Sequence, residues 1–179
     1  MDVTVVKWGT PAEEVAGIAA VAAALVARRE VPVRRVGFAA PNRTWAAQMA
    51  RACHDLGLRA AVADGPLPSC ERCAPIMDVR RVEGDFDWLF LFGCTDGLVP
   101  EDASLAEALD HARQSAVVSY FTAIDAALAR QIHLPVLRTK SLNGTSVATC
   151  RPARFLSALG DGRPSTIGGQ ALLRAHGLN

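Results

Sequence analysis

The sequence predicts an α/β fold in which helices flank a parallel β-sheet. Three observations support this fold class. Short strand-like segments alternate along the chain with helical segments of about 10–15 residues, which is the order that a parallel sheet requires. Glycine and proline residues separate most of these segments. Half of the 179 residues are hydrophobic, which is enough to build the core of one domain that covers residues 1–179.

The first strand and the first helix have clear local signals. Val3–Trp8 alternates in the manner of a half-buried strand. Thr10 can cap the next helix, which we expect over Pro11–Arg29 because proline suits the first helical position. Glu13 and Glu14 lie in the first turn, where the positive end of the helix dipole favours acidic side chains.

The remaining elements continue the alternation. A second strand is expected at Val36–Ala39, and a second helix at Thr44–Leu56 ends where Gly57 follows it. The later elements are a strand at Leu58–Ala63, a mostly polar strand at Ile76–Val82, a core strand at Trp88–Phe92, a helix at Leu105–Gln114 capped by Ser104, a strand at Ala116–Phe121, a helix at Ala123–Arg130 and a strand at Leu134–Arg138. Since no repeat or linker interrupts this order, we expect a single domain without an inserted subdomain.

The most informative segment is the core strand with the loops on either side of it. The charged loop Glu83–Asp87 leads into Trp88–Phe92, and the two-glycine turn Gly93–Pro100 follows. Ligands of α/β proteins bind where loops leave the ends of strands, so we expect a functional site here. The cations closest to the charged loop in the sequence are Arg80 and Arg81, and we expect no other cation beside it.

Composition excludes several classes of protein. The formal charge is +1, from 19 basic and 18 acidic residues, so a contact with nucleic acid must depend on a local patch of charge. The longest apolar stretch, Val15–Ala27, is shorter than the ~20 residues that cross a bilayer, and no signal-peptide pattern opens the chain. The five cysteines are scattered and odd in number. We therefore expect a reduced, cytoplasmic protein without a membrane partner.

The candidate metal and catalytic residues are incomplete. Cys70 and Cys73 have the spacing of half a zinc site, but a structural zinc ion needs four ligands. Cys53 and His54 are the one conceivable second pair, and adjacent residues of a helix point in different directions. The histidines that lie beside acidic residues lack a nucleophile at a suitable spacing. We expect no bound metal and no catalytic residue in this chain.

Four segments together resemble a known family. Val36–Asn42, Glu83–Asp87, Gly93–Pro100 and Arg151–Phe155 are similar, in this order, to segments of the second RecA-like domain of the UvrD/Rep/PcrA superfamily I DNA helicases. Each motif is short, so their shared order carries the resemblance, which extends over Val3–Leu159. It implies a RecA-like sheet. The chain contains no Gly-x-x-x-x-Gly-Lys-Ser/Thr sequence, so this domain lacks the phosphate-binding P-loop.

The resemblance also implies a function that depends on a second domain. The C-terminal RecA-like domain of such a helicase contacts single-stranded DNA and nucleotide together with a separate P-loop domain, in the same chain or in another, during DNA repair and related processes. ATP and Mg²⁺ would be cofactors only when the two domains are paired. The chain alone is expected to be catalytically inactive, and we expect no cofactor for it.

Three positions have lost the cations that the family carries. Ala40 takes the place of an arginine, and Glu83 takes the place of a lysine. In the segment that resembles the arginine-finger motif, Asp125 replaces the arginine, a group worth about 10³–10⁵ in rate where it is present. Arg130 could supply this group if the helix had a different register.

The resemblance selects two sets of site residues. Weak nucleotide contacts are implied for Gly84, Asp85 and Arg130. Contacts with DNA or with a partner are implied for Asn42, Arg43, Arg80, Arg81, Arg151 and Arg154. Two alternatives remain open. These cations are ordinary surface charges, or the chain is a non-catalytic, helicase-derived scaffold that binds proteins and has lost its nucleotide and DNA contacts.

Overall fold

Ten strands and five α-helices lie in the part of the chain that the computed structural model describes, residues 1–63, 72–99, 102–154, 156 and 166–178. The strands are β1 (Asp2–Trp8), β2 (Val36–Ala40), β3 (Ala60–Val62), β4 (Ala74–Asp78), β5 (Phe86–Leu91), β6 (Ala112–Phe121), β7 (Ala123–Asp125), β8 (Arg138–Leu142), β9 (Thr145–Thr149) and β10 (Thr166–Gly168). The helices are α1 (Pro11–Ala27), α2 (Arg43–Asp55), α3 (Asp102–Leu109), α4 (Ala126–Gln131) and α6 (Gly169–Ala175), with the 3-10 helices η1 (Val33–Arg35) and η2 (Val79–Arg81).

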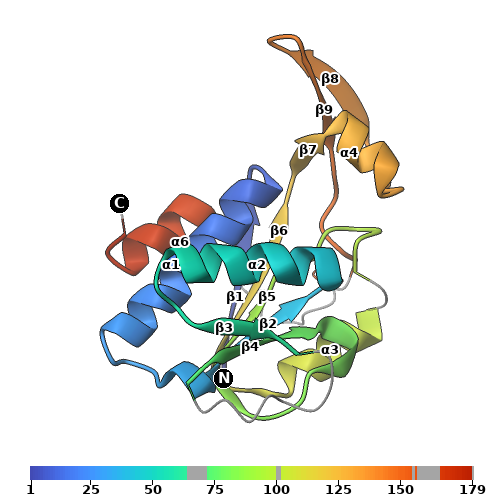
Figure 1. The fold of residues 1–179 in the computed structure, drawn as a ribbon. Coiled ribbons are helices and arrows are strands. Elements are labelled where there is room, and N and C mark those ends of the chain that lie inside the picture. The colour runs from blue at the N-terminus through green and yellow to red at the C-terminus, as the bar shows by residue number, and fades with distance from the viewer. Residues whose placement is uncertain (64–71, 100–101, 155, 157–165, 179) are drawn as a thin grey trace.

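Seven of the strands form one parallel sheet in the order β10-β1-β6-β5-β2-β4-β3. Helices α1, α2 and α6 cover one face of this sheet, and α3 lies on the other (Figure 1). The predicted α/β class with a helix-flanked parallel sheet is therefore confirmed, and the arrangement is consistent with a RecA-like fold.

The expected caps begin the first two helices. At α1, the Glu13 amide donates to the Thr10 hydroxyl over 3.3 Å, and the Thr10 amide donates to the Glu13 carboxylate over 3.1 Å. This reciprocal capping box satisfies amide groups that the helix itself leaves unpaired. At α2, Asn42 accepts from the amide of Trp45. The signals around Thr10 and Gly57 predicted both helices to within about two residues.

Two hydrophobic clusters lie on the two faces of the sheet. Side chains of β5 alternate between them, as the period of a strand requires. Phe90 packs with Phe38 under α1 and α2, with ring centroids 5.5 Å apart. Leu89 and Leu91 pack with Leu105 of α3 on the opposite face. Because its side chains enter both clusters, β5 is the centre of the core. Burial of each such side chain is worth about 1.5–3 kcal/mol.

Two expectations for the middle of the chain were wrong. The strand expected at Ile76–Val82 begins and ends earlier, as β4. Four of its five residues are buried, whereas we expected a mostly polar strand. The helix expected at Leu105–Gln114 ends at Leu109, and Ser104 lies inside it. Residues 112–115 instead extend β6, which pairs with β5 on one side and β1 on the other. Sheet hydrogen bonds therefore override the helical pattern there.

The three remaining strands, β7, β9 and β8, form a small antiparallel sheet that projects with α4 from one end of the large sheet (Figure 1). We call residues 123–149 the arm. The helix expected at Ala123–Arg130 begins later, as α4, and the strand expected at Leu134–Arg138 is wrong, since β8 starts at Arg138. Asn143 and Gly144 turn the hairpin with φ of 50° and 79°. Asn-Gly between two strands is a strong hairpin signal.

The last described segment docks on the first. β10 pairs with β1, and α6 packs beside α1. A Cβ atom on Gly169 would lie 2.1 Å from the Trp8 ring, and one on Gly17 of α1 would lie 2.0 Å from it. Glycine is therefore required on both sides of this indole. In the described part of the chain, no helix combines the length and the apolar character needed to cross a bilayer.

Candidate functional site

All seven strands of the large sheet point the same way, so their carboxyl ends share one edge. We call this the carboxyl edge, and the arm rises from it (Figure 1). The opposite side is the amino edge. The six residues of β5 separate the two edges by about 20 Å, at roughly 3.3 Å per residue. Residues that follow a strand and residues that precede one therefore belong to different sites.

The turn after β5, residues 93–99, lies at the centre of the carboxyl edge, and we call it the β5 turn. Gly93 and Gly97 have φ of 67° and 82°, a region that favours glycine. A Cβ atom on Gly93 would lie 2.9 Å from Pro41, and one on Gly97 would lie 2.2 Å from Pro135 of the arm. The β5 turn is thus fitted between the loop after β2 and the base of the arm.

This turn also lies at a topological switch point. Strands β2 and β5 are neighbours, but the chain leaves β2 for α2 on one face and leaves β5 for α3 on the other (Figure 1). Connections that diverge in this way open a crevice between the strand ends, where α/β proteins bind their ligands. The structure therefore places the predicted functional turn where a ligand site is expected.

Four of the predicted DNA- or partner-binding residues follow β2 and β4 directly. Asn42 and Arg43 begin α2, and Arg80 and Arg81 lie in η2. The strand register pairs the last residue of β2 with the last residue of β4, so both segments start level with each other at the carboxyl edge. Arg80 binds the carboxylate of Asp78 through two nitrogens, at 2.9 and 2.6 Å.

The other two residues of this set arrive from the far end of the arm. After β9 the chain returns to the β5 turn, where the Asp96 amide donates to the Arg151 carbonyl over 2.9 Å. The Ala153 amide donates to the Cys94 carbonyl over the same distance. Arg151 and Arg154 are therefore held at the carboxyl edge, although about sixty residues separate them from β5 in the sequence. Asn42, Arg43, Arg151 and Arg154 therefore lie at this edge, whereas Arg80 and Arg81 lie in η2, which packs against α3 and leads from the end of β4 toward the amino edge.

Beneath the β5 turn lies a buried carboxyl group that the sequence analysis assigned to the helix dipole. Glu14 of α1 is fully buried, and its Oε1 accepts from the Gly93 amide over 3.0 Å and from the Ser119 hydroxyl over 2.5 Å. Among the described residues, Oε2 has no hydrogen-bond partner. Burial raises the pKa of Glu14 to about 7, against the effect of the two hydrogen bonds. In the sequence, the signal for this burial was the position of Glu14 one turn before Ile18, on the apolar stripe of α1.

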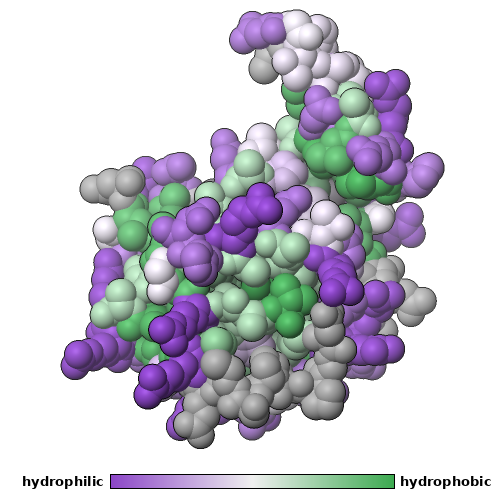
Figure 2. Space-filling view, viewed as in Figure 1, coloured by the Kyte–Doolittle hydropathy of each residue, from purple (hydrophilic) through white to green (hydrophobic). Residues whose placement is uncertain are grey.

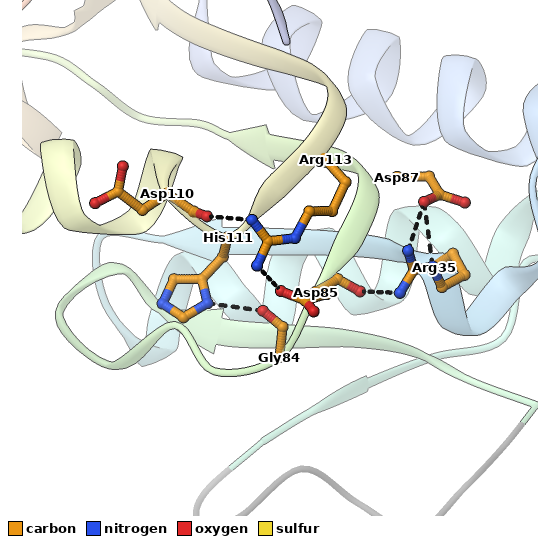
Figure 3. Close-up of polar contacts among 7 residues, drawn as sticks. All are labelled: Arg35, Gly84, Asp85, Asp87, Asp110, His111 and Arg113. Carbon is orange, nitrogen blue, oxygen red and sulfur yellow. Dashed lines mark hydrogen bonds and ion pairs between the residues drawn. The ribbon is translucent and has the colours of Figure 1, made fainter.

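The charged loop before β5 lies at the amino edge, and the fold supplies it with cations that the sequence analysis missed. Arg113 of β6 pairs with Asp85, and Arg35 of η1 donates to the Asp85 carbonyl over 3.0 Å (Figure 3). Two nitrogens of Arg35 also donate to Asp87 Oδ1, over 3.2 and 2.7 Å. The expectation that no cation besides Arg80 and Arg81 lies beside this loop was wrong. Arg35 and Arg113 are distant in sequence but flank the loop, because β2 and β6 pair with β5 on its two sides.

The backbone of this loop is also engaged. A hydrogen bond of 2.7 Å joins Nδ1 of His111 to the carbonyl of Gly84 (Figure 3). The loop is thus tied to η1, to the turn before β6 and to β6 itself. The carboxylates of Asp85 and Asp87 already have arginine partners from this chain. These contacts fix the shape of the loop and offset the charge of both groups.

The three predicted nucleotide-contacting residues do not come together. Gly84 and Asp85 lie at the amino edge, before β5. Arg130 lies on α4 of the arm, beyond the carboxyl edge, where its Nε donates to the Ala126 carbonyl over 3.3 Å. A single nucleotide cannot bridge these positions across the length of β5. The alternative role considered for Arg130 therefore has no geometric support.

The three positions with lost cations also lie apart. Ala40 is fully buried at the end of β2, and Glu83 is exposed at the amino edge. Asp125 caps α4, since its Oδ1 accepts from the amides of Ala127 and Leu128 over 2.9 and 3.0 Å. The acidic group at the expected arginine-finger position thus has a local structural task on the arm.

Neither a metal site among the described residues nor a match to another protein indicates the function. The described residues contain no group of three histidine, cysteine or acidic side chains that could hold a metal ion. Cys70, one of the two cysteines with zinc-like spacing, lies outside the described residues, as does Phe155 at the end of the family-like segment. Comparison of the chain with protein-family models and with curated protein sequences gave no match.

Proposed function

We propose that this chain is a RecA-like domain of a UvrD/Rep-like DNA helicase that binds single-stranded DNA along its carboxyl edge. It works with a separate P-loop domain, in the same chain or in another. Three facts support the proposal. The sheet is of the expected class, the family-like motifs follow each other in the expected order, and Arg43, Arg151 and Arg154, which the resemblance selects, lie at one edge.

The gathering of these cations is the observation that carries the proposal. The predicted DNA-contacting residues come from three segments, and those after β2 and β9 lie together at the carboxyl edge, while η2 begins directly after β4. Arg151 is exposed at this edge, and Arg81 is exposed in η2. Asp78 offsets the charge of Arg80, so Arg80 contributes less to phosphate binding. Cations along one edge favour a phosphate backbone, because each phosphate they neutralise releases bound counterions.

We expect nucleotide binding only when this chain is paired with a P-loop domain. Without a P-loop, this chain cannot cradle a triphosphate, and the carboxylate of Asp85 is already paired with Arg113. ATP and Mg²⁺ would be held mainly by the P-loop domain. The purified chain is expected to hydrolyse no ATP, which a phosphate-release assay checks. ATP hydrolysis that copurifies with the wild-type chain, and that is lost when a residue of this chain is substituted, would contradict this part of the proposal.

Fluorescence anisotropy with a labelled oligothymidylate over a salt series tests the DNA part. The wild-type chain should bind at low salt and lose affinity as salt rises, with a slope of about −0.7 for each phosphate that it neutralises. Replacing Arg81 and Arg151 together by alanine should flatten the slope by about 1–1.5. The matched control replaces Arg34 and Arg59, two exposed arginines at the amino edge. No binding at low salt, or an equal loss in the control, would refute the proposal.

A second candidate function is a non-catalytic scaffold that binds another protein. Two observations favour it. The loop before β5 is saturated by contacts within the chain, and the arm exposes Leu128, Val136 and Leu137, whose exposed fractions are 41%, 45% and 52%. Figure 2 shows a hydrophobic area over α4, bordered by hydrophilic residues. In the anisotropy experiment, this function predicts no binding of the oligonucleotide at any salt concentration.

A further inference from the structure

The carboxyl group of Glu14 joins three elements beneath the carboxyl edge. Glu14 lies in the first turn of α1, Gly93 begins the β5 turn, and Ser119 lies near the end of β6. Both hydrogen bonds to these residues end on the same oxygen of Glu14, over 3.0 and 2.5 Å. The amide of Gly93 is the first donor group of the β5 turn. The position of this turn relative to the sheet therefore depends on Glu14.

The β5 turn in turn holds the segment that carries Arg151. Cys94 accepts from the amide of Ala153, Asp96 donates to the carbonyl of Arg151, and Thr95 forms an isolated bridge with Pro152. These contacts begin one residue after Gly93. A displacement of Gly93 would reach Arg151 through these backbone hydrogen bonds and through β6, where the Ser119 carbonyl accepts from the Cys94 amide over 2.9 Å.

We propose that Glu14 is a positioning residue for the DNA-binding edge, because its carboxyl group sets the place of the β5 turn and, through the turn, of Arg151. The inference rests on the function proposed above and adds a means of regulation to the same edge. In the neutral form, Oε2 carries a proton and Oε1 keeps both donors. In the ionised form, Oε2 becomes a buried charged acceptor without a partner, which is costly. Movement of the β5 turn toward water would relieve this cost.

Other charged and titratable groups lie around Glu14, but the proposed movement of the β5 turn depends on the carboxyl group of Glu14 itself. On its own helix, Glu13 is engaged in the cap of α1. The β5 turn contributes the buried thiol of Cys94, whose pKa is raised well above its usual range by burial and then by the charge of Glu14, and it contributes Asp96. Lys7 on β1 is exposed, and Tyr120 on β6 is half-buried. Among the described residues, no lysine, arginine or histidine pairs with Glu14.

The test measures oligonucleotide affinity at pH 6 and pH 8, at constant ionic strength, for the wild-type chain and for Glu14→Gln. Glutamine retains an oxygen acceptor and stays neutral at both pH values. The wild-type affinity should fall about fivefold from pH 6 to pH 8, the low end of ordinary coupling between sites, and the variant should change less than twofold. Other groups contribute equally in both proteins, so the difference isolates Glu14. Equal pH dependence in the two proteins would overturn the inference.

Ser119→Ala provides a second variant in case Glu14→Gln does not fold. It removes one donor that stabilises the ionised carboxylate, so the midpoint of the affinity change should move to higher pH. An unchanged midpoint would also overturn the inference. Failure of the proposed function gives a different result, because no protein would then bind the oligonucleotide at either pH.

Discussion

The two edges of the large sheet handle charge in opposite ways. At the amino edge, exposed or half-buried carboxylates of the loop before β5 pair with arginines of the same chain (Figure 3). At the carboxyl edge, arginines from distant segments gather around the β5 turn, and an acidic group is buried beneath them without any cationic partner among the described residues. The comparison teaches that the paired Asp85 and Asp87 serve the fold, whereas the exposed Arg151 marks the edge where we expect a ligand.

The largest expected effect concerns the buried charge at the carboxyl edge. The pKa of Glu14 is raised from 4.5 to about 7 in the folded chain, so the folded state binds more protons than the unfolded state between these pH values. The contribution of Glu14 to the free energy of unfolding should therefore be fully present below pH 4.5 and be lost, by roughly 3 kcal/mol, as pH rises to about 7. Urea unfolding of the wild-type chain and of Glu14→Gln measures it, since the difference between them removes the contributions of other groups. Parallel pH profiles of the two proteins would contradict the prediction.

The second prediction separates backbone strain from packing at the β5 turn. Gly93→Ala places a Cβ atom in a left-handed conformation and 2.9 Å from Pro41, so it should lower the free energy of unfolding by about 3 kcal/mol. The matched control is Gly57→Ala, where φ is 75° and no atom lies within 4 Å of the new Cβ. That variant should lose only about 1 kcal/mol. Equal losses in urea unfolding would mean that the β5 turn is not tightly fitted against the loop after β2.

These cases also indicate how far the sequence alone could lead. Local signals predicted the elements that local chemistry determines, such as the cap at Thr10 and the end of α2 at Gly57. The resemblance selected Asn42, Arg43, Arg151 and Arg154, which the fold brings to one edge. The partners of the loop before β5 could not be predicted, because Arg35 and Arg113 reach it only through the order of the strands. Glu14 resembled a helix-dipole residue, and only the packing of β6 against α1 reveals its burial.

The third prediction concerns the amino edge. Arg35→Ala removes two donors from the partly buried Asp87 and one from the loop backbone, so the free energy of unfolding should fall by about 1 kcal/mol. Oligonucleotide affinity should remain within twofold of the wild-type value, because this arginine serves the fold. Urea unfolding and anisotropy measure the two effects. A loss of affinity with unchanged stability would show that the amino edge also binds DNA.

The smallest expected effect is at the exposed pair of Asp85 and Arg113, whose side chains are 50% and 52% exposed. Solvent screens such a pair, so Arg113→Ala should change the free energy of unfolding by less than about 0.5 kcal/mol. The effect should shrink further at high salt. Thermal and urea unfolding at two ionic strengths check this expectation. A change as large as that of Arg35→Ala would mean that the two ion pairs are coupled.

The central claim is that the carboxyl edge, and not the loop before β5, contacts single-stranded DNA. Titration of isotopically labelled chain with oligothymidylate, followed by backbone amide chemical shifts, tests it most directly. The account predicts the largest shift changes at Arg43, Arg81, Arg151 and residues 93–99, with little change at residues 84–87. Shift changes concentrated at residues 84–87, or absent throughout at low salt, would contradict it.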